Sequence, residues 1–110
     1  MNNLYFKEKG DYIASTGYAQ LRTKESSMFL YQFLHTNQFV NNVLERCTGT
    51  SYPAINSNDL SKIRINIPSL KEQQKIATYL SAIDKKITTI QTQIDKTQAF
   101  KKGLLQGMFV

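Results

Sequence analysis

Hydrophobic and polar positions change their spacing near residue 69, and this change divides the chain into two regions. Before it, short apolar stretches alternate with turn residues, as is typical of strands and short helices. After it, six aliphatic residues recur at intervals of four, three, four, three and four. We therefore expect an α+β fold. A small mixed sheet-and-helix globular part (residues 1–68) is followed by a long C-terminal coiled-coil helix (residues 69–110).

Strand-like patterns occur four times in the first region, at residues 4–7, 12–15, 18–22 and 63–67. The last of these is the clearest, because three isoleucines alternate with Arg64 and Asn66. Alternation of this kind predicts a half-buried strand. Pro68 should end it, since proline has no amide hydrogen to donate to a sheet.

Two short helices are predicted between these strands. Ser26 is a suitable N-cap for a helix that runs to Leu34, and a second helix should end before Gly49. We expect the aromatic residues of these helices to form the core: Phe29, Tyr31, Phe33 and Phe39. A polar loop follows at residues 50–58, and Asn58 should cap one further turn.

The second region begins with a capping box, in which the Ser69 hydroxyl accepts a hydrogen bond from the amide of Glu72. The predicted helix-pairing residues then follow at heptad positions d and a: Ile76, Leu80, Ile83, Ile87, Ile90 and Ile94. A helix over residues 71–102 would be roughly 48 Å long and should extend past a domain about 30 Å across. Thr97 and Lys101 interrupt the seam, so we expect a frayed or separately packed tail.

Charge and composition narrow the class of protein. The net charge is +6, which suits a polyanionic partner, although an ordinary solvated surface explains it equally well. No apolar run is long enough to cross a bilayer, and no signal peptide opens the chain. A single cysteine excludes an intramolecular disulfide. We expect a cytoplasmic protein.

Catalytic motifs are missing from the sequence. No glycine-rich phosphate loop or dinucleotide turn occurs, and the two prolines are isolated from any methyltransferase or nuclease motif. His35 lies among apolar residues and is interpreted as a helix-end histidine, and Cys47 as a small apolar helix residue. We therefore expect a protein that is not an enzyme, holds no metal or cofactor and binds neither S-adenosylmethionine nor ATP.

Two stretches of the chain carry a recognisable pattern. The first is GTSYPAINSNDL (residues 49–60), which is followed by INIP (residues 65–68). The second lies on the long predicted helix, with EQQKIA (72–77), LSAIDKKI (80–87) and KKGLLQ (101–106). Together they resemble the specificity (S) subunit of type I restriction–modification enzymes. YIASTGYA (12–19) and the aromatic helix at 29–34 are similar to the middle of a target-recognition domain of the same family.

This resemblance implies separate roles for the globular domain and the long helix. A target-recognition domain would read part of a bipartite site in double-stranded DNA, and a long helix would pair with its counterpart and dock methyltransferase (M) subunits. The partners, including a restriction (R) subunit, would carry S-adenosylmethionine and ATP. With one helix and residues 1–68 before it, the chain is interpreted as the C-terminal part of one half. The alternative is an oligomerising helical scaffold that does not bind DNA alone.

Phosphate contacts need Arg, Lys, amides or hydroxyls, and base contacts need planar bidentate groups or small side chains. On this basis the candidate DNA-binding residues are Arg22, Lys24, Thr50, Ser51, Tyr52, Asn56, Lys62 and Arg64. Ordinary solvation of the basic residues, and turn-type hydrogen bonds in the polar loop, are the alternative interpretations. The helix seam predicts a homo-oligomer, most simply a two-fold dimer.

Overall fold

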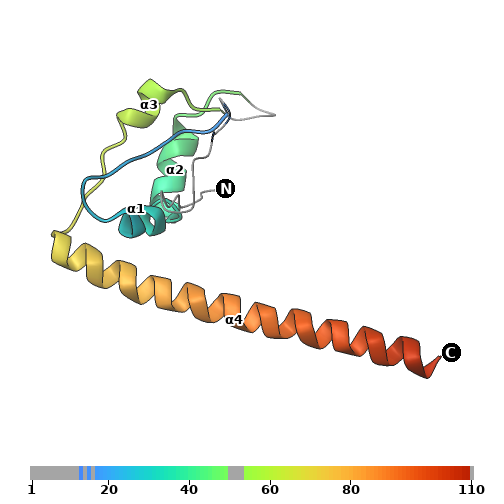
Figure 1. Ribbon diagram of the computed structural model, residues 1–110. Helices are drawn as coiled ribbons and strands as arrows, with labels where there is room; N and C mark the ends of the chain where they lie inside the picture. The colour runs from blue at the N-terminus through green and yellow to red at the C-terminus, as the bar shows by residue number, and fades with distance from the viewer. Residues whose placement is uncertain (1–12, 14, 16, 50–53, 110) are drawn as a thin grey trace. The chain divides into compact units, whose positions relative to one another are not determined.

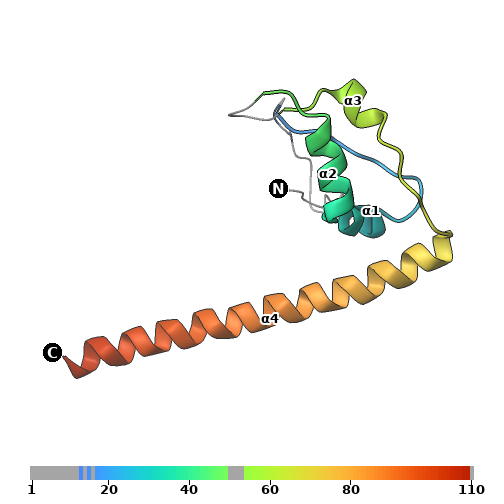
Figure 2. The ribbon, with the colours of Figure 1, turned by 180° about the vertical axis from the view of Figure 1, so that it is seen from behind.

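The computed structural model describes residues 13, 15, 17–49 and 54–109 (Figures 1 and 2). The chain divides into two compact units, Met1–Ala77 and Thr78–Val110, here called the N-terminal and C-terminal units. The described helices are α1 (Ser27–Phe33), α2 (Asn37–Glu45), α3 (Ser57–Ser61) and α4 (Leu70–Met108). The first two turns of α4 therefore belong to the N-terminal unit.

Helices α1 and α2 both begin at a hydroxyl side chain, of which only Ser26 was predicted from the sequence. The Ser26 Oγ accepts a hydrogen bond from the Phe29 amide at 3.1 Å. The Thr36 Oγ1 does the same for the Phe39 amide at 3.3 Å. Each cap supplies an acceptor to an amide that has no partner within its own helix. The two predicted helices are thus confirmed.

Aromatic rings join these two helices. Phe33 lies between Phe29, at a centroid distance of 6.3 Å, and Phe39, at 5.9 Å. Phe29 is buried, whereas Tyr31, Phe33 and Phe39 are half-buried. The predicted aromatic cluster therefore exists, but Phe29 is its only buried member, and the other three are half-buried.

The predicted α+β fold class is wrong. About 66% of the described residues are helical and 2% are in β-structure, with no sheet. The β-structure is one isolated antiparallel bridge between Thr48 and Ala54. Neither 18–22 nor 63–67 forms a strand, while the predicted strand at 4–7 and part of that at 12–15 lie outside the described residues.

The reason for this error is visible in the segment that joins α3 to α4. Ile63 and Ile65 are half-buried and Arg64 is exposed, as alternation predicts, whereas Ile67 is exposed. Among the described residues, however, no neighbouring strand pairs with this backbone. Alternation determines which side chains face inward, but a sheet also needs a hydrogen-bonding partner.

Two expected helix boundaries also require correction. Helix α3 is capped by Asn56 rather than by Asn58. Helix α4 does not end or fray near Lys102, because it continues through Gly103 and Gly107 to Met108. A glycine inside a helix costs only about 1 kcal/mol relative to alanine, and the lysines and leucines beside Gly103 favour the helix.

The predicted start of α4 is confirmed. The Ser69 hydroxyl accepts a hydrogen bond from the Glu72 amide at 3.4 Å, as a capping box requires. The Ser69 carbonyl accepts a second bond from the Gln73 amide at 2.9 Å. With 39 residues, α4 is roughly 58 Å long.

Candidate functional site

The six predicted helix-pairing residues lie on one face of α4, and five of them are exposed within a single chain. Ile76 and Ile83 are each 40% exposed, and Ile87 is 59% exposed. Ile90 and Ile94 are similarly exposed, and Leu80 is half-buried. A continuous aliphatic stripe of this kind on a regular helix is the surface that coiled coils bury.

The stripe continues beyond Ile94 further than the sequence interpretation allowed. Counting heptads from Ile76 places Thr97 at d and Lys101 at a, and then returns Leu104 to d and Met108 to a. Because α4 is unbroken to Met108, these two residues extend the same face. The Thr97 Oγ1 donates to the Gln93 carbonyl at 2.8 Å, so this polar position satisfies its hydroxyl within the helix.

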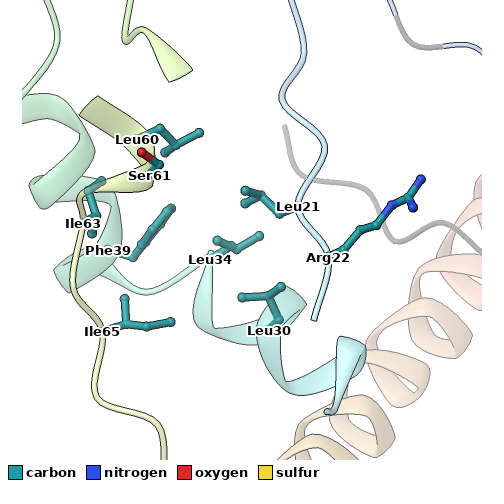
Figure 3. Close-up of a pocket in the computed structure, with 9 residues that line it drawn as sticks. All are labelled: Leu21, Arg22, Leu30, Leu34, Phe39, Leu60, Ser61, Ile63 and Ile65. Atoms are coloured by element: carbon teal, nitrogen blue, oxygen red, sulfur yellow. The ribbon is translucent and has the colours of Figure 1, made fainter. Parts of the chain in front are cut away.

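A shallow apolar groove lies in the N-terminal unit, with a volume of about 210 Å³ (Figure 3). It is formed by the side chains of the 18–22 segment, α1, α2, α3 and the segment after α3. Its lining residues are Leu21, Arg22, Leu30, Leu34, Phe39, Leu60, Ser61, Ile63 and Ile65.

Among the candidate DNA-binding residues, Arg22 lines this groove, and its guanidinium group points away from the apolar side chains (Figure 3). Lys62 and Arg64 lie on either side of Ile63, another lining residue. All three basic side chains are exposed, and Lys24 is exposed as well. Of these four basic residues only Arg22 lines the groove, and Lys62 and Arg64 are the sequence neighbours of the lining residue Ile63.

The remaining candidates are three loop residues and Asn56. Thr50, Ser51 and Tyr52 lie outside the described residues. The Asn56 side chain is used by α3. Its Oδ1 accepts from the Asp59 amide and its Nδ2 donates to the Asp59 Oδ2, both at 2.8 Å. These two bonds occupy both ends of the amide in a local structural role.

Among residues 13, 15, 17–49 and 54–109, no group of three or more His, Cys, Asp or Glu side chains could hold a metal ion. The His35 Nδ1 lies 2.8 Å from the Tyr31 carbonyl, at the end of α1. This contact agrees with its interpretation as a helix-end histidine. Over the same residues, no helix is long and apolar enough to cross a membrane.

Comparison with known proteins decides the family. A family profile described as "Type I restriction modification DNA specificity domain" matches residues 2–98. This chain belongs to that family. The specificity-domain match covers most of both units, so the globular region and most of α4 are part of the same family pattern.

Curated relatives carry the corresponding name. The chain is 31% identical over 107 residues to the type I restriction enzyme MjaVIII specificity subunit of Methanocaldococcus jannaschii, covering 96% of this chain and 25% of the relative. It is 28% identical over 98 residues to the EcoDI specificity subunit of Escherichia coli, covering 89% and 22%. The chain thus spans about a quarter of the length of these relatives. No solved structure matches it.

Two features of this specificity-domain chain were missed from the sequence. One is the return of Leu104 and Met108 to the seam, which a longer heptad count reveals. The other is Gln73, which is only 2% exposed and is the most buried polar side chain among the described residues. Its neighbours Glu72 and Gln74 are exposed, so nothing in the local polar sequence distinguishes Gln73 from them.

Proposed function

We propose that this chain acts as a DNA-specificity module of a type I restriction–modification system. In this proposal residues 1–68 contribute to a DNA-contacting surface, and residues 69–110 pair with a second helix and dock methyltransferase subunits. The exposed aliphatic seam of α4, in a chain of the specificity-domain family, carries the proposal. The chain serves to bind and position DNA and partner subunits, and catalysis takes place on those partners.

The pairing partner of α4 is proposed to be the same helix of a second copy. Reversing the seam about residue 85 exchanges Ile76 with Ile94, Leu80 with Ile90, and Ile83 with Ile87. An antiparallel pair therefore places an aliphatic side chain opposite every aliphatic side chain. If each of the six buries about 60 Å², the apolar gain is about 9 kcal/mol per helix before the entropic cost of association.

A lysine in the seam favours the antiparallel over the parallel arrangement. In a parallel pair at equal register, Lys101 would face Lys101 of the second copy at an a position. Reversal about residue 85 moves it opposite residue 69 instead. The same reversal brings the two copies' Lys86 side chains near each other, but these flank the seam and are exposed, so solvent and salt screen them.

Disulfide trapping tests this arrangement in a Cys47→Ser background. Equal amounts of an Ile83→Cys chain and an Ile87→Cys chain are mixed and oxidised. The antiparallel pair predicts a mixed disulfide between the two variants, because positions 83 and 87 face each other across the seam. Homodisulfides formed by each variant alone, with no preference for the mixed species, would contradict it.

The proposed DNA surface consists of the basic residues beside the groove, Arg22, Lys62 and Arg64, together with Lys24 and the loop residues Thr50, Ser51 and Tyr52. Support comes from the family assignment, the net charge of +6 and the exposure of these four basic side chains. Asn56 is left out because its amide is engaged in capping α3. The proposed location is the cytoplasm, where double-stranded DNA and the M and R subunits would be available.

A further inference from the structure

One heptad position of α4 is already covered by the N-terminal unit to which it belongs. Counting back from Ile76 places Gln73 at position a, and this residue is only 2% exposed. Its Nε2 donates to the Pro68 carbonyl at 2.9 Å and to the Glu25 carboxylate. A second helix has almost no surface of Gln73 to contact, so the part of the seam that is open to a partner begins at Ile76.

The other end of α4 carries a separate apolar surface, here called the end patch. It consists of five exposed side chains, Phe100, Leu104, Leu105, Met108 and Phe109. Lys101 precedes Leu104 by three residues and Leu105 by four, so it lies on the same side of the helix as the patch. Residues 96–110 contain three lysines and no acidic residue. The end patch therefore suits a surface that is both apolar and acidic.

The register of the proposed antiparallel pair identifies what the end patch meets. Reversal about residue 85 places Thr97 of one copy opposite Gln73 of the other, the position that is already covered. Helix α4 continues for eleven more residues after Thr97, to Met108. These residues lie beyond the last open layer of the seam. They therefore run against the N-terminal unit of the second copy rather than along its α4 seam.

The surface around Gln73 complements the end patch in polarity and charge. Four exposed side chains belong to residues that bind or flank Gln73 and its partner Pro68, namely Glu25, Ile67, Leu70 and Glu72. Two of them are aliphatic and two are carboxylates. The same reversal places Lys101 opposite residue 69, which is one helical turn from Glu72. A lysine surrounded by apolar side chains thus approaches a carboxylate beside apolar side chains.

We infer that the end patch of one copy docks on the surface around Gln73 of a second copy, with Lys101 paired with Glu72. This inference rests on the proposed antiparallel dimer. By two-fold symmetry the contact is made twice in each dimer. The six aliphatic residues of the seam would accept many apolar helices, whereas this contact requires a lysine at one position and a carboxylate at another. It would therefore select the partner chain by charge.

Zero-length crosslinking with a carbodiimide tests the contact on the full chain. Within one chain Glu72 and Lys101 lie on the same helix, 29 residues or roughly 44 Å apart, so an amide bond between them can form only between two copies. Mass spectrometry of the digested dimer should find the Lys101–Glu72 crosslink. Lys102 is the internal control, because it lies at position b and should give little crosslink to Glu72.

Light scattering on the same sample separates this inference from the proposed function. A dimer without the Lys101–Glu72 crosslink would overturn the docking contact and leave the antiparallel pair in place. A mass of one chain at high micromolar concentration would overturn both.

Charge reversal provides a second readout, the dissociation constant of the dimer from sedimentation equilibrium. Lys101→Glu should raise it about tenfold, because two carboxylates then face each other at both ends of the dimer. Lys102→Glu makes the same change of charge at an exposed neighbouring position and should change it less than about twofold. Combining Lys101→Glu with Glu72→Lys should restore most of the lost affinity. Equal weakening by Lys101→Glu and Lys102→Glu, or no recovery in the folded double variant, would overturn the inference.

Discussion

Thr48 and Ala54 exchange two backbone hydrogen bonds, of 2.9 and 3.0 Å, and so hold together the two ends of the segment that contains Thr50, Ser51 and Tyr52. Two residues later Asn56 caps α3. The candidate DNA-binding segment is thus attached at both ends to ordered backbone. Substitutions at Gly49, next to this bridge, and at Asn56 test the backbone on either side of the segment.

Glycine has opposite roles at two positions of this chain. Gly49, next to the bridge, has φ 97°, where a side chain is strained, so Gly49→Ala should lower the free energy of unfolding by roughly 1 kcal/mol. Gly103 lies inside α4, with no heavy atom within 4 Å of an added Cβ, so Gly103→Ala should raise helix stability by about 0.5–1 kcal/mol. Thermal melting followed by circular dichroism measures both. If Gly49→Ala and Gly103→Ala changed the stability by equal amounts in the same direction, the opposite roles of the two glycines would be contradicted.

Asn56→Ala should destabilise the N-terminal unit by about 1 kcal/mol, because Asp59 loses the side-chain acceptor for its amide. Asn58→Ala is the matched control. The Asn58 carbonyl accepts from Ser61, a backbone interaction that the substitution preserves. Urea unfolding monitored by circular dichroism compares the two. A larger loss of stability in Asn58→Ala would show that the cap has been assigned to the wrong residue.

DNA binding by this chain should be weak and sensitive to salt, because exposed basic side chains dominate the proposed surface. If about three phosphates are neutralised, log affinity should fall with log salt at a slope near −2.7. Replacing both Lys62 and Arg64 with alanine should reduce the magnitude of that slope by about 1.8. Fluorescence anisotropy with a random-sequence duplex, repeated across a series of salt concentrations, measures the slope.

Lys85→Ala on the exposed face of α4 provides the control for the loss of charge alone. It should leave the slope nearly unchanged. Tight binding that does not respond to salt would contradict a phosphate-dominated surface, and an equal effect of Lys85→Ala would place the contacts on α4 instead.

Ile83→Asp together with Ile87→Asp should separate the proposed dimer into monomers. Two seam side chains lose about 3 kcal/mol of apolar burial, so the dissociation constant should rise at least about 100-fold. Thr88→Asp with Thr92→Asp adds the same charge at the same spacing away from the seam and should leave the dimer intact. Sedimentation velocity measures the change, and circular dichroism should show α1 and α2 retained in both variants.

The helices of this chain could be predicted from its sequence because their determinants are local. Ser26 supplies its cap to a residue three positions ahead, and the heptad spacing of α4 is read from consecutive residues. Whether the first region forms a sheet could not be predicted from local sequence in this way. The alternation at 63–67 agrees with the partial burial of Ile63 and Ile65 but not with the exposure of Ile67, and strand pairing depends on backbone elsewhere in the fold.

The same limit explains why Asn58 was predicted as the cap of α3 in place of Asn56, and why the burial of Gln73 was not predicted. Asn56 and Asn58 are equally good caps in sequence, and the choice depends on Asn56 having an extended backbone, with ψ 161°, directly before the helix. Gln73 is distinguished from Gln74 by its burial and by its hydrogen bonds to the Pro68 carbonyl and to the distant Glu25 carboxylate. Interactions across 48 residues of chain leave no signature in local spacing.

Self-association through the α4 seam is the central claim, and light scattering coupled to size-exclusion chromatography tests it most directly on the unmodified chain. For a chain of 12.6 kDa, the antiparallel pair predicts a mass of twice that value at high micromolar concentration, falling toward the monomer on dilution. A mass that stays at one chain throughout that concentration range would contradict the account.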